Sequence, residues 1–150
     1  MKTVKLAKKK KIKKTPTGWG NELEIHNGDG YCGRVLTVEE GKQSSYHYHI
    51  KKNETFYVLD GILEVELSFD LRSKTSTLHK GDCIDIPRYI IHRFKGKTDA
   101  TVLEISTYDD GEDDIVRCQP GDNQPKYAWM AGDKEFIAWE KKVNRILGKS

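Results

Sequence analysis

The chain has 150 residues, of which 36% are hydrophobic and 33% are charged, with a formal net charge of +3. This length suits a single domain with a buried core and an enclosed site. No uninterrupted apolar run approaches the roughly 20 residues of a membrane-spanning helix or matches the roughly 7–15 residues of a secretory signal core. The three cysteines are widely separated, which is typical of reduced thiols rather than of a disulfide framework. We therefore predict a cytoplasmic protein that does not contact a membrane.

The positive charge is concentrated at the amino terminus. Residues 1–14 carry eight lysines and no acidic residue, whereas the remaining 136 residues carry 18 basic and 23 acidic side chains, a net charge of −5. A run of like charges repels itself and is typical of a solvated arm. Nucleic-acid binding needs a basic face on the folded domain, so the acidic body argues against such a partner. We predict a basic arm over residues 1–14 and a folded domain after it.

Short strand-like segments dominate the next hundred residues. Residues 15–20 are rich in turn formers, and strand periodicity then alternates with turn signals to about residue 107. The predicted strands are Glu22–His26, Gly33–Val38, Ser44–His49, Glu54–Leu59, Leu63–Phe69, Ser76–His79, Cys83–Ile86, Ile90–Lys95 and Thr101–Thr107. Many short strands at regular spacing predict an all-β sandwich or small barrel over residues 15–118.

The end of the chain has a different character. After an acidic, glycine-containing segment, residues 119–150 begin as a loop, and apolar residues then recur at helical spacing from Asp133 to Leu147. Asp133 can cap this helix and Gly148 can end it. The apolar stripe consists of Phe136, Trp139, Val143 and Ile146. We predict a C-terminal α-helix that packs on the barrel or on a partner subunit.

Four residues in the predicted sheet have side chains that bind metals. Because side chains alternate along a strand, His47 and His49 project from one face, and Glu54 begins the next strand. If His92 lies on a neighbouring strand and faces the same way, three imidazoles and one carboxylate converge. Such a set binds one divalent ion, namely zinc, manganese, cobalt, nickel or iron, and leaves positions open for a substrate. The alternative is that these histidines only pair or titrate on a surface sheet.

The spacing of these residues resembles the two signature motifs of the cupin superfamily. The first motif, G-x5-HxH-x3,4-E-x6-G, matches at every position from Gly41 to Gly61, and the second, G-x5-PxG-x2-H-x3-N, begins at Gly81. The second motif departs at Tyr89, where glycine is usual, and at Gly96, where asparagine is common. The resemblance implies a double-stranded β-helix, the cupin jelly-roll barrel. By that resemblance, the four metal-ligand positions are held by His47, His49, Glu54 and His92.

Two flanking segments resemble those of the type II mannose-6-phosphate isomerases and related sugar isomerases. They are residues 19–25 and the contiguous G-E-D-D-I-V-R run at residues 111–117. The resemblance implies metal-dependent aldose–ketose isomerisation of a sugar or sugar phosphate, in which a base moves a proton between adjacent carbons. Glu104 is the candidate base, with Asp85 and Tyr48 as alternatives. Arg117 either takes part in catalysis or holds the acidic loop by salt bridges.

Several cations near the ligands are candidates for binding phosphate or sugar hydroxyls, because phosphate sites commonly use basic side chains. Arg88 and Arg93 flank the strand that carries His92, and Lys51 follows His49 closely. Lys52, beside Lys51, and Arg117, in the run at residues 111–117, are further candidate cations. We predict that Lys51, Arg88 and Arg93 bind the substrate.

Two other functions suit the same ligand set. An iron-dependent dioxygenase would use the open positions for a small organic substrate and oxygen, whereas isomerases use redox-inert ions. A non-catalytic cupin would bind a sugar without converting it. Because dimers are common among cupins, the resemblance also predicts a homodimer, formed through an edge strand near the amino terminus or through the predicted helix.

Overall fold

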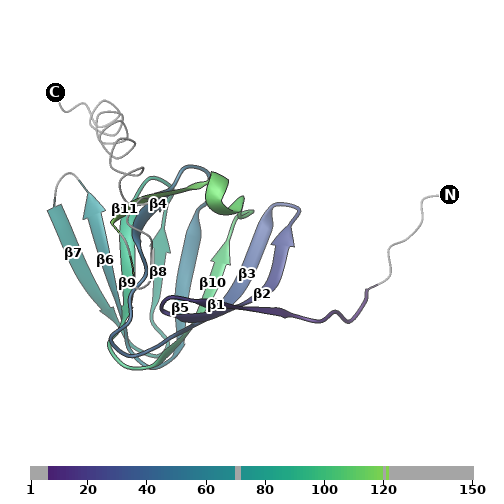
Figure 1. Cartoon of the computed structure of the whole chain (residues 1–150), viewed down its shortest axis with the longest axis horizontal. Helices are drawn as coiled ribbons and strands as arrows, with labels where there is room; N and C mark the ends of the chain where they lie inside the picture. The colour runs from purple at the N-terminus through teal and green to yellow at the C-terminus, as the bar shows by residue number, and fades with distance from the viewer. Residues whose placement is uncertain (1–6, 70–71, 120, 122–150) are drawn as a thin grey trace.

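The computed structural model describes residues 7–69, 72–119 and 121 as two packed antiparallel sheets (Figure 1). The only helix in this part of the chain is a 3-10 turn, η1 (Gly111–Asp113). No helix among the described residues has the length and apolar character needed to cross a membrane. The all-β prediction is confirmed, whereas the predicted helix from Asp133 to Leu147 lies outside the described residues.

Eleven strands are described, in two sheets. The six-stranded sheet contains, in spatial order, β1 (Lys13–Thr17), β2 (Gly20–Gly28), β3 (Tyr31–Val38), β10 (Ala100–Ser106), β5 (Glu54–Asp60) and β8 (Cys83–Ile86). The five-stranded sheet contains β11 (Ile115–Gln119), β4 (Tyr46–His49), β9 (Ile91–Gly96), β6 (Leu63–Phe69) and β7 (Arg72–Leu78). Nine of these strands overlap the predicted ones, and β1 and β11 are additional.

The first strand, β1, begins inside the segment predicted to be a solvated arm and continues through part of the predicted turn. It pairs with β2, with Lys13 opposite Glu24 and Thr17 opposite Gly20. Most of its side chains are exposed, so no hydrophobic alternation marks it in the sequence. Pro16 is tolerated because an edge strand needs hydrogen bonds on one side only. Residues 7–12 form neither helix nor strand.

The inward face of the barrel is apolar at one end of the strands and polar at the other. On β5, Val58 and Phe56 belong to the main hydrophobic core, and Glu54, two residues nearer the start of the strand, is also buried. The same change occurs on three other strands. The buried polar residues on β3, β9 and β10 are Arg34, His92, Glu104 and Ser106. The hydrophobic core therefore forms the floor beneath a buried polar site.

One departure from the cupin motif, Tyr89, lies at a position with positive φ. Tyr89 has φ 71°, in the left-handed region where glycine is favoured because it has no Cβ. Its ring packs against a second cluster of buried residues, and the Arg88 guanidinium lies 5.6 Å from the ring centroid. The buried residues of that cluster are Tyr48, Ile91, Val116 and Cys118. A tyrosine therefore holds the left-handed conformation here while its ring is packed on both the cluster and Arg88.

The turn after β5 provides a stability test with a matched control. Gly61 has φ 78°, and a Cβ there would lie 2.1 Å from the Asp99 carbonyl oxygen, whereas Gly41 has φ 77° with nothing within 4 Å. Gly41→Ala should cost about 1–2 kcal/mol from the left-handed conformation alone. Gly61→Ala should cost about 1–3 kcal/mol more, because the backbone must shift. Urea denaturation of the two variants measures this difference, and equal losses would contradict the turn geometry.

Candidate metal centre

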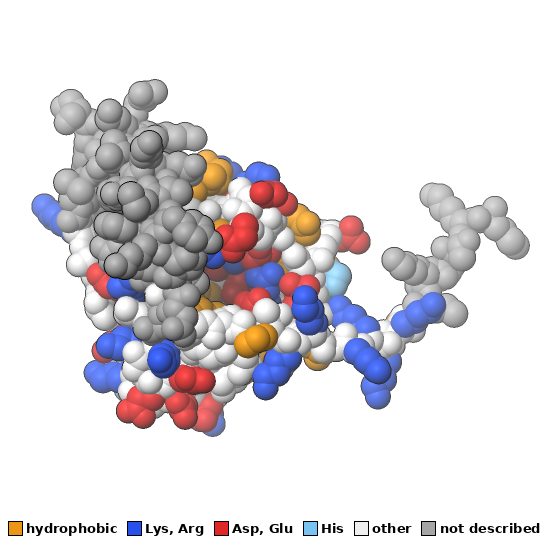
Figure 2. Space-filling model, in the orientation of Figure 1, with side chains coloured by type: hydrophobic (Ala, Val, Ile, Leu, Met, Phe, Trp, Pro, Cys, Tyr) orange, Lys and Arg blue, Asp and Glu red, His pale blue; other side chains and the backbone are white. Residues whose placement is uncertain are grey.

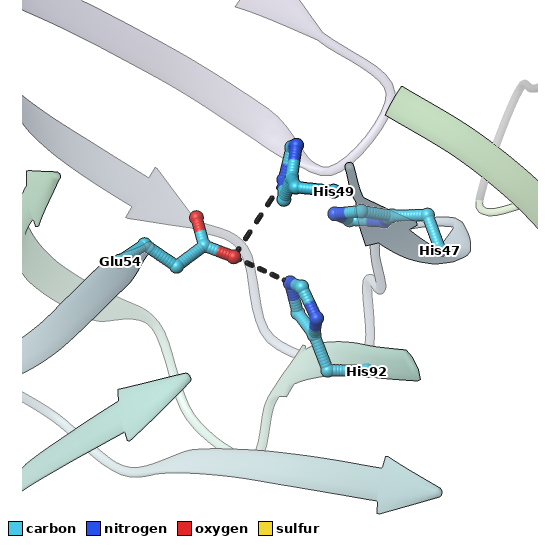
Figure 3. A group of neighbouring side chains, drawn as sticks. All are labelled: His47, His49, Glu54 and His92. Carbon is cyan, nitrogen blue, oxygen red and sulfur yellow. Dashed lines mark ion pairs between the residues drawn. The ribbon is translucent and has the colours of Figure 1, made fainter. Parts of the chain in front are cut away.

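The four predicted ligands come together from three strands. His47 and His49 lie on β4, Glu54 begins β5, and His92 lies on β9 directly opposite His47 in the sheet register. One potential ligand atom from each residue lies within 4.8 Å of those of the others, and the four side chains point toward one another (Figure 3). All four residues are at most 7% exposed. The structure therefore has a buried cluster that is capable of holding a metal ion.

Two buried polar atoms inside the cluster lack a hydrogen-bond partner among the described residues, and a bound cation would compensate for this. Glu54 Oε1 lies 2.6 Å from His92 Nε2 and 3.6 Å from His49 Nε2. Despite this proximity, Glu54 Oε1 and His92 Nε2 are buried without a hydrogen-bond partner among the described residues. Buried polar atoms without partners are costly unless another group compensates them. Three imidazoles and a carboxylate match the donor preference of zinc and of first-row transition metals.

The outer nitrogens of the histidines face oxygen acceptors. His47 Nδ1 donates to the Ser45 carbonyl oxygen at 2.8 Å, and His92 Nδ1 donates to the Ile90 carbonyl oxygen at 2.9 Å. A carbonyl only accepts, so the proton stays on Nδ1 and the Nε2 lone pair is available to a metal. Burial lowers the pKa of His47 well below its ordinary value and the pKa of His49 to about 3. Both imidazoles are therefore neutral at pH 7, as metal ligation requires.

Asp114 lies behind the third histidine and was not singled out in the sequence analysis. Its carboxylate is 1% exposed and accepts the backbone N–H groups of Lys51 at 2.6 Å and Lys52 at 3.1 Å. Asp114 Oδ2 also lies 3.3 Å from His49 Nδ1. A carboxylate behind a ligating histidine orients its ring and raises its basicity. The sequence could have pointed to Asp114, because this residue lies within the G-E-D-D-I-V-R run at residues 111–117.

Asp114→Asn is expected to weaken metal affinity by about 10–100-fold, the usual loss when such a supporting carboxylate is removed. Asp110→Asn is the matched control, because Asp110 lies in the same loop but pairs with the exposed Lys51 ammonium. Titration with Co²⁺, followed by its visible absorption and by chelator competition, measures both affinity and ligand geometry. Equal affinity and identical spectra for the two variants would show that Asp114 does not support His49.

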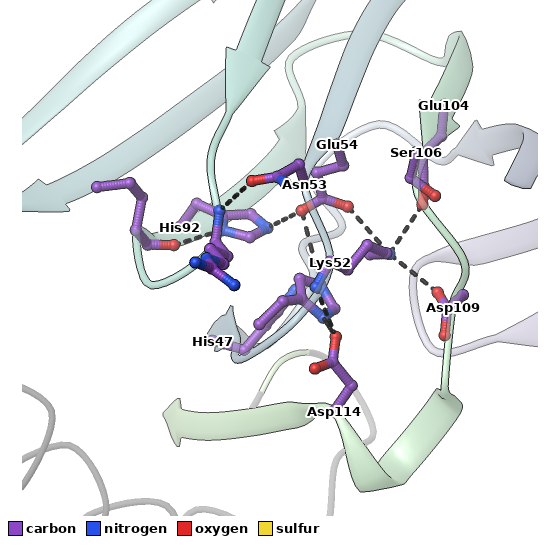
Figure 4. A network of polar contacts seen from close by, with 12 residues as sticks. His47, Lys52, Asn53, Glu54, His92, Glu104, Ser106, Asp109 and Asp114 are labelled. Atoms are coloured by element: carbon purple, nitrogen blue, oxygen red, sulfur yellow. Dashed lines mark hydrogen bonds and ion pairs between the residues drawn. The ribbon is translucent and has the colours of Figure 1, made fainter. Parts of the chain in front are cut away.

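Lys52 lies at the centre of a network of buried charges beside the ligands (Figure 4). Its ammonium is 3.1 Å from Glu54 Oε2, 2.9 Å from Glu104 Oε1 and 2.9 Å from Asp109 Oδ2. Arg34 completes the network, since its guanidinium pairs with Asp109 and lies 3.7 Å from Glu104. We call these five residues the charge cluster. It joins the candidate metal ligand Glu54 to side chains on β3, β10 and the loop after β10.

The pKa values within the charge cluster follow from burial and pairing. Burial would raise the pKa of Glu54, but Lys52 and His92 hold it well below its ordinary value. Burial raises the pKa of Glu104, although Lys52 opposes the shift. Burial would lower the pKa of Lys52, but Glu104, Glu54 and Asp109 together raise it above the ordinary lysine value. Lys52 therefore stays protonated, and Glu104 is the carboxylate most easily protonated in this cluster.

We call His47, His49, Glu54 and His92 the metal cluster, since they could hold one metal ion. The metal cluster and the charge cluster border a cavity of about 630 Å³. Figure 2 shows acidic and basic side chains gathered in this hollow. Glu104 and Arg117 both line the cavity, as do three of the four metal-ligand candidates, His47, His49 and Glu54. Arg117 donates from Nη2 to Glu112 Oε1 at 2.8 Å, which is the salt bridge named as the alternative to its catalytic role. The volume is sufficient for a small organic molecule.

The alternative bases lie elsewhere. The Tyr48 side chain belongs to the second hydrophobic cluster, on the face of β4 opposite to its histidines. Asp85 is exposed on β8 and accepts a hydrogen bond from the Thr55 hydroxyl at 2.7 Å. Neither residue lines the cavity in the described structure. Of the three candidate bases, the structure places Glu104 alone beside the site.

The cations expected to bind substrate do not line the cavity. Lys51 is exposed and pairs with Asp110 at 2.7 Å, and Arg88 is exposed with its guanidinium near the Tyr89 ring. The Arg93 guanidinium lies 5.4 Å from the ring centroid of Tyr46, on the outer face of β9. Arg93 follows His92 directly, so strand alternation alone places its side chain on the other face. Among the described residues, the basic side chains of the cavity wall are Arg34, Lys52 and Arg117.

Fold and site together define a double-sheet jelly roll with a three-histidine, one-glutamate cluster at the polar end of its interior. The Cupin domain family matches residues 34–108 of the chain. The chain therefore belongs to the cupin family, and the resemblance inferred from the two motifs is confirmed.

Among known proteins, the chain is similar to a mannose-1-phosphate guanylyltransferase of Sinorhizobium fredii, with 35% identity over 102 residues. The match covers 66% of this chain but 19% of that protein, so the chain spans about a fifth of its relative's length.

Two solved structures share the fold. The capsular polysaccharide assembling protein CapF from Staphylococcus aureus gives a TM-score of 0.62 at 18% identity, covering 70% of this chain and 30% of CapF. A mutant of the Bacillus subtilis oxalate decarboxylase OxdC gives a TM-score of 0.62 at 16% identity, covering 71% and 30%. At this level of identity, the likeness concerns the fold and carries no statement of activity.

Proposed function

We propose that the protein is a metal-dependent isomerase that interconverts an aldose and a ketose, as a free sugar or as a sugar phosphate. The observation that carries the proposal is that a buried carboxylate, Glu104, and a three-histidine, one-glutamate cluster border the same cavity. Similarity to a mannose-1-phosphate guanylyltransferase supports a sugar-type ligand. The flanking segments at residues 19–25 and 111–117 support an isomerase.

The four ligands would hold one divalent ion, namely zinc, manganese, cobalt, nickel or iron. A bound ion would supply Lewis-acid polarisation of the carbonyl and hydroxyl oxygens of the open-chain sugar. In the proposed reaction, Glu104 takes the proton from the carbon beside the carbonyl and returns it to the former carbonyl carbon. The proton of the neighbouring hydroxyl passes to the former carbonyl oxygen, so that the hydroxyl and carbonyl groups exchange places. A base works best with a pKa near the working pH, and burial raises the pKa of Glu104 in that direction.

The neighbours of Glu104 support this role. The Lys52 ammonium, 2.9 Å from Glu104 Oε1, stabilises the ionised carboxylate and fixes its position. Phe56 and Phe94 line the cavity from the hydrophobic core, which limits the water around the base. In the proposed site, Arg117 at the cavity wall binds a substrate oxygen. These residues orient the sugar and hold the proton while the carbonyl position changes.

The test is hydrogen exchange and interconversion with the metal-loaded chain. The protein is loaded separately with zinc, manganese, cobalt and, without oxygen, iron, and is incubated in D₂O with aldoses, ketoses and their phosphates. Proton NMR should show deuterium entering at carbon 2 together with aldose–ketose conversion. Sugar binding without exchange would favour a non-catalytic cupin. Oxygen consumption that requires iron would favour a dioxygenase.

A further inference from the structure

The charges that line the cavity are predominantly negative. The acidic residues among the described lining residues are Glu22, Glu54, Glu104, Asp109 and Glu112. The basic residues among them are Arg34, Lys52 and Arg117. With His47 and His49 neutral and every carboxylate ionised, the described lining has a formal charge of −2. A divalent ion held by the metal cluster brings that charge to zero.

Each of these three cations is already paired with carboxylates. Lys52 contacts three of them within 3.1 Å, and Arg34 pairs with Asp109 and, at 3.1 Å, with Glu24. The side chains of Lys52 and Arg34 are only 4% and 11% exposed. A phosphate that recruited Lys52 would displace a buried carboxylate, as would one that displaced Asp109 from Arg34, and a buried charge that loses its partner is costly.

A phosphate monoester carries about −1.5 to −2 charges at pH 7. In this cavity the phosphate would lie beside carboxylates, and the nearby cations are already paired with those carboxylates. Repulsion between like charges is strong where water is limited. Sugar hydroxyls are instead attracted to these carboxylates, because hydroxyls donate hydrogen bonds and ionised carboxylates only accept them. The lining suits a ligand with many hydroxyl groups and no negative charge.

Resting on the isomerase function proposed above, we infer that the substrate is an unphosphorylated sugar. A phosphate would bind most easily at Arg117, where it would replace the Glu112 carboxylate. The Glu112 side chain is 78% exposed, so it can leave Arg117 at little cost, unlike the carboxylates around Lys52. A Glu112→Gln variant should therefore change the preference between neutral and phosphorylated sugars.

The experiment compares neutral and phosphorylated forms of the same sugars on the full chain loaded with manganese. The probes are mannose, fructose, glucose, ribose and ribulose, each with its terminal phosphate ester, and calorimetry and the exchange assay measure binding and conversion. For the sugars that bind, we expect the neutral form to be favoured by at least about tenfold in affinity or in kcat/KM. Glu112→Gln should improve affinity for the phosphate esters more than affinity for the neutral sugars, so that the preference for the neutral form falls. Glu64→Gln, which removes an acid paired with Lys97 on the surface, should change neither.

The outcomes separate the inference from the isomerase proposal. Conversion of the phosphate esters in preference to the neutral sugars would overturn the inference and uphold the isomerase. Binding of neutral sugars without exchange would uphold the ligand class and overturn the isomerase. Failure of every neutral sugar to bind would overturn the inference.

Discussion

Lys52→Met is expected to lower the free energy of unfolding by about 3–5 kcal/mol, the usual cost of leaving buried charges without their partner. The ammonium of Lys52 lies within 3.1 Å of carboxylate oxygens from Glu54, Glu104 and Asp109, and its side chain is 4% exposed. Methionine keeps the length and the apolar stem but removes the charge. The three carboxylates would then repel one another inside the barrel. Urea denaturation of the metal-free protein at pH 7 measures the loss.

The adjacent residue supplies the control for this prediction. Lys51→Met removes an exposed ammonium paired with Asp110, so it should leave the urea midpoint nearly unchanged. The double variant Lys52→Met with Glu104→Gln should recover part of the stability, because one of the uncompensated carboxylates is gone. A urea midpoint for Lys52→Met equal to that of Lys51→Met would contradict the role given to the charge cluster.

Glu104→Gln is expected to lower kcat for aldose–ketose conversion by about 10²–10⁴-fold, the usual contribution of a positioned acid or base. Glutamine has nearly the same shape but cannot accept the proton. Glu104 is not in the metal cluster, so the variant should retain its metal. The exchange assay in D₂O, together with metal analysis of the same sample, measures both properties.

Asp85→Asn is the control for the proton-transfer step, because Asp85 was an alternative base and lies outside the cavity in the described structure. It should keep the wild-type rate. A Glu104→Gln variant with undiminished kcat would remove Glu104 from the mechanism. A reduced rate in Asp85→Asn with an unchanged rate in Glu104→Gln would move the base to β8.

The sequence predicted the metal cluster well because its geometry depends on local rules. Strand alternation places His47 and His49 on one face of β4, His92 lies on the neighbouring β9, and Glu54 faces them from β5 in the other sheet. The strands that face the core also carry clear signals, since a half-buried strand alternates apolar and polar residues. Leu63–Phe69 was predicted with the bounds that β6 has in the structure.

The charge cluster could not be predicted because its members meet through long-range pairing. Arg34 and Glu104 are directly opposite each other only because β3 pairs with β10 in one register. Asp109 enters the cluster from a loop whose position depends on Asn27, which donates to the Asp109 carbonyl oxygen at 2.9 Å. Closeness in sequence to a ligand did not predict which side chains line the cavity, as Arg93 shows. Its side chain faces away from the site that its neighbour His92 forms.

Metal analysis of the purified chain, beside His47→Ala, His92→Ala and His79→Ala, tests whether the three-histidine, one-glutamate cluster binds a metal ion. His79 is exposed and lies outside the cluster, so its variant controls for the loss of a histidine. We predict about one divalent ion per chain in the wild type and in His79→Ala, and little or none in His47→Ala and His92→Ala. A wild-type chain that binds no metal after incubation with zinc, manganese, cobalt, nickel and iron would contradict the account, as would metal that persists in both cluster variants.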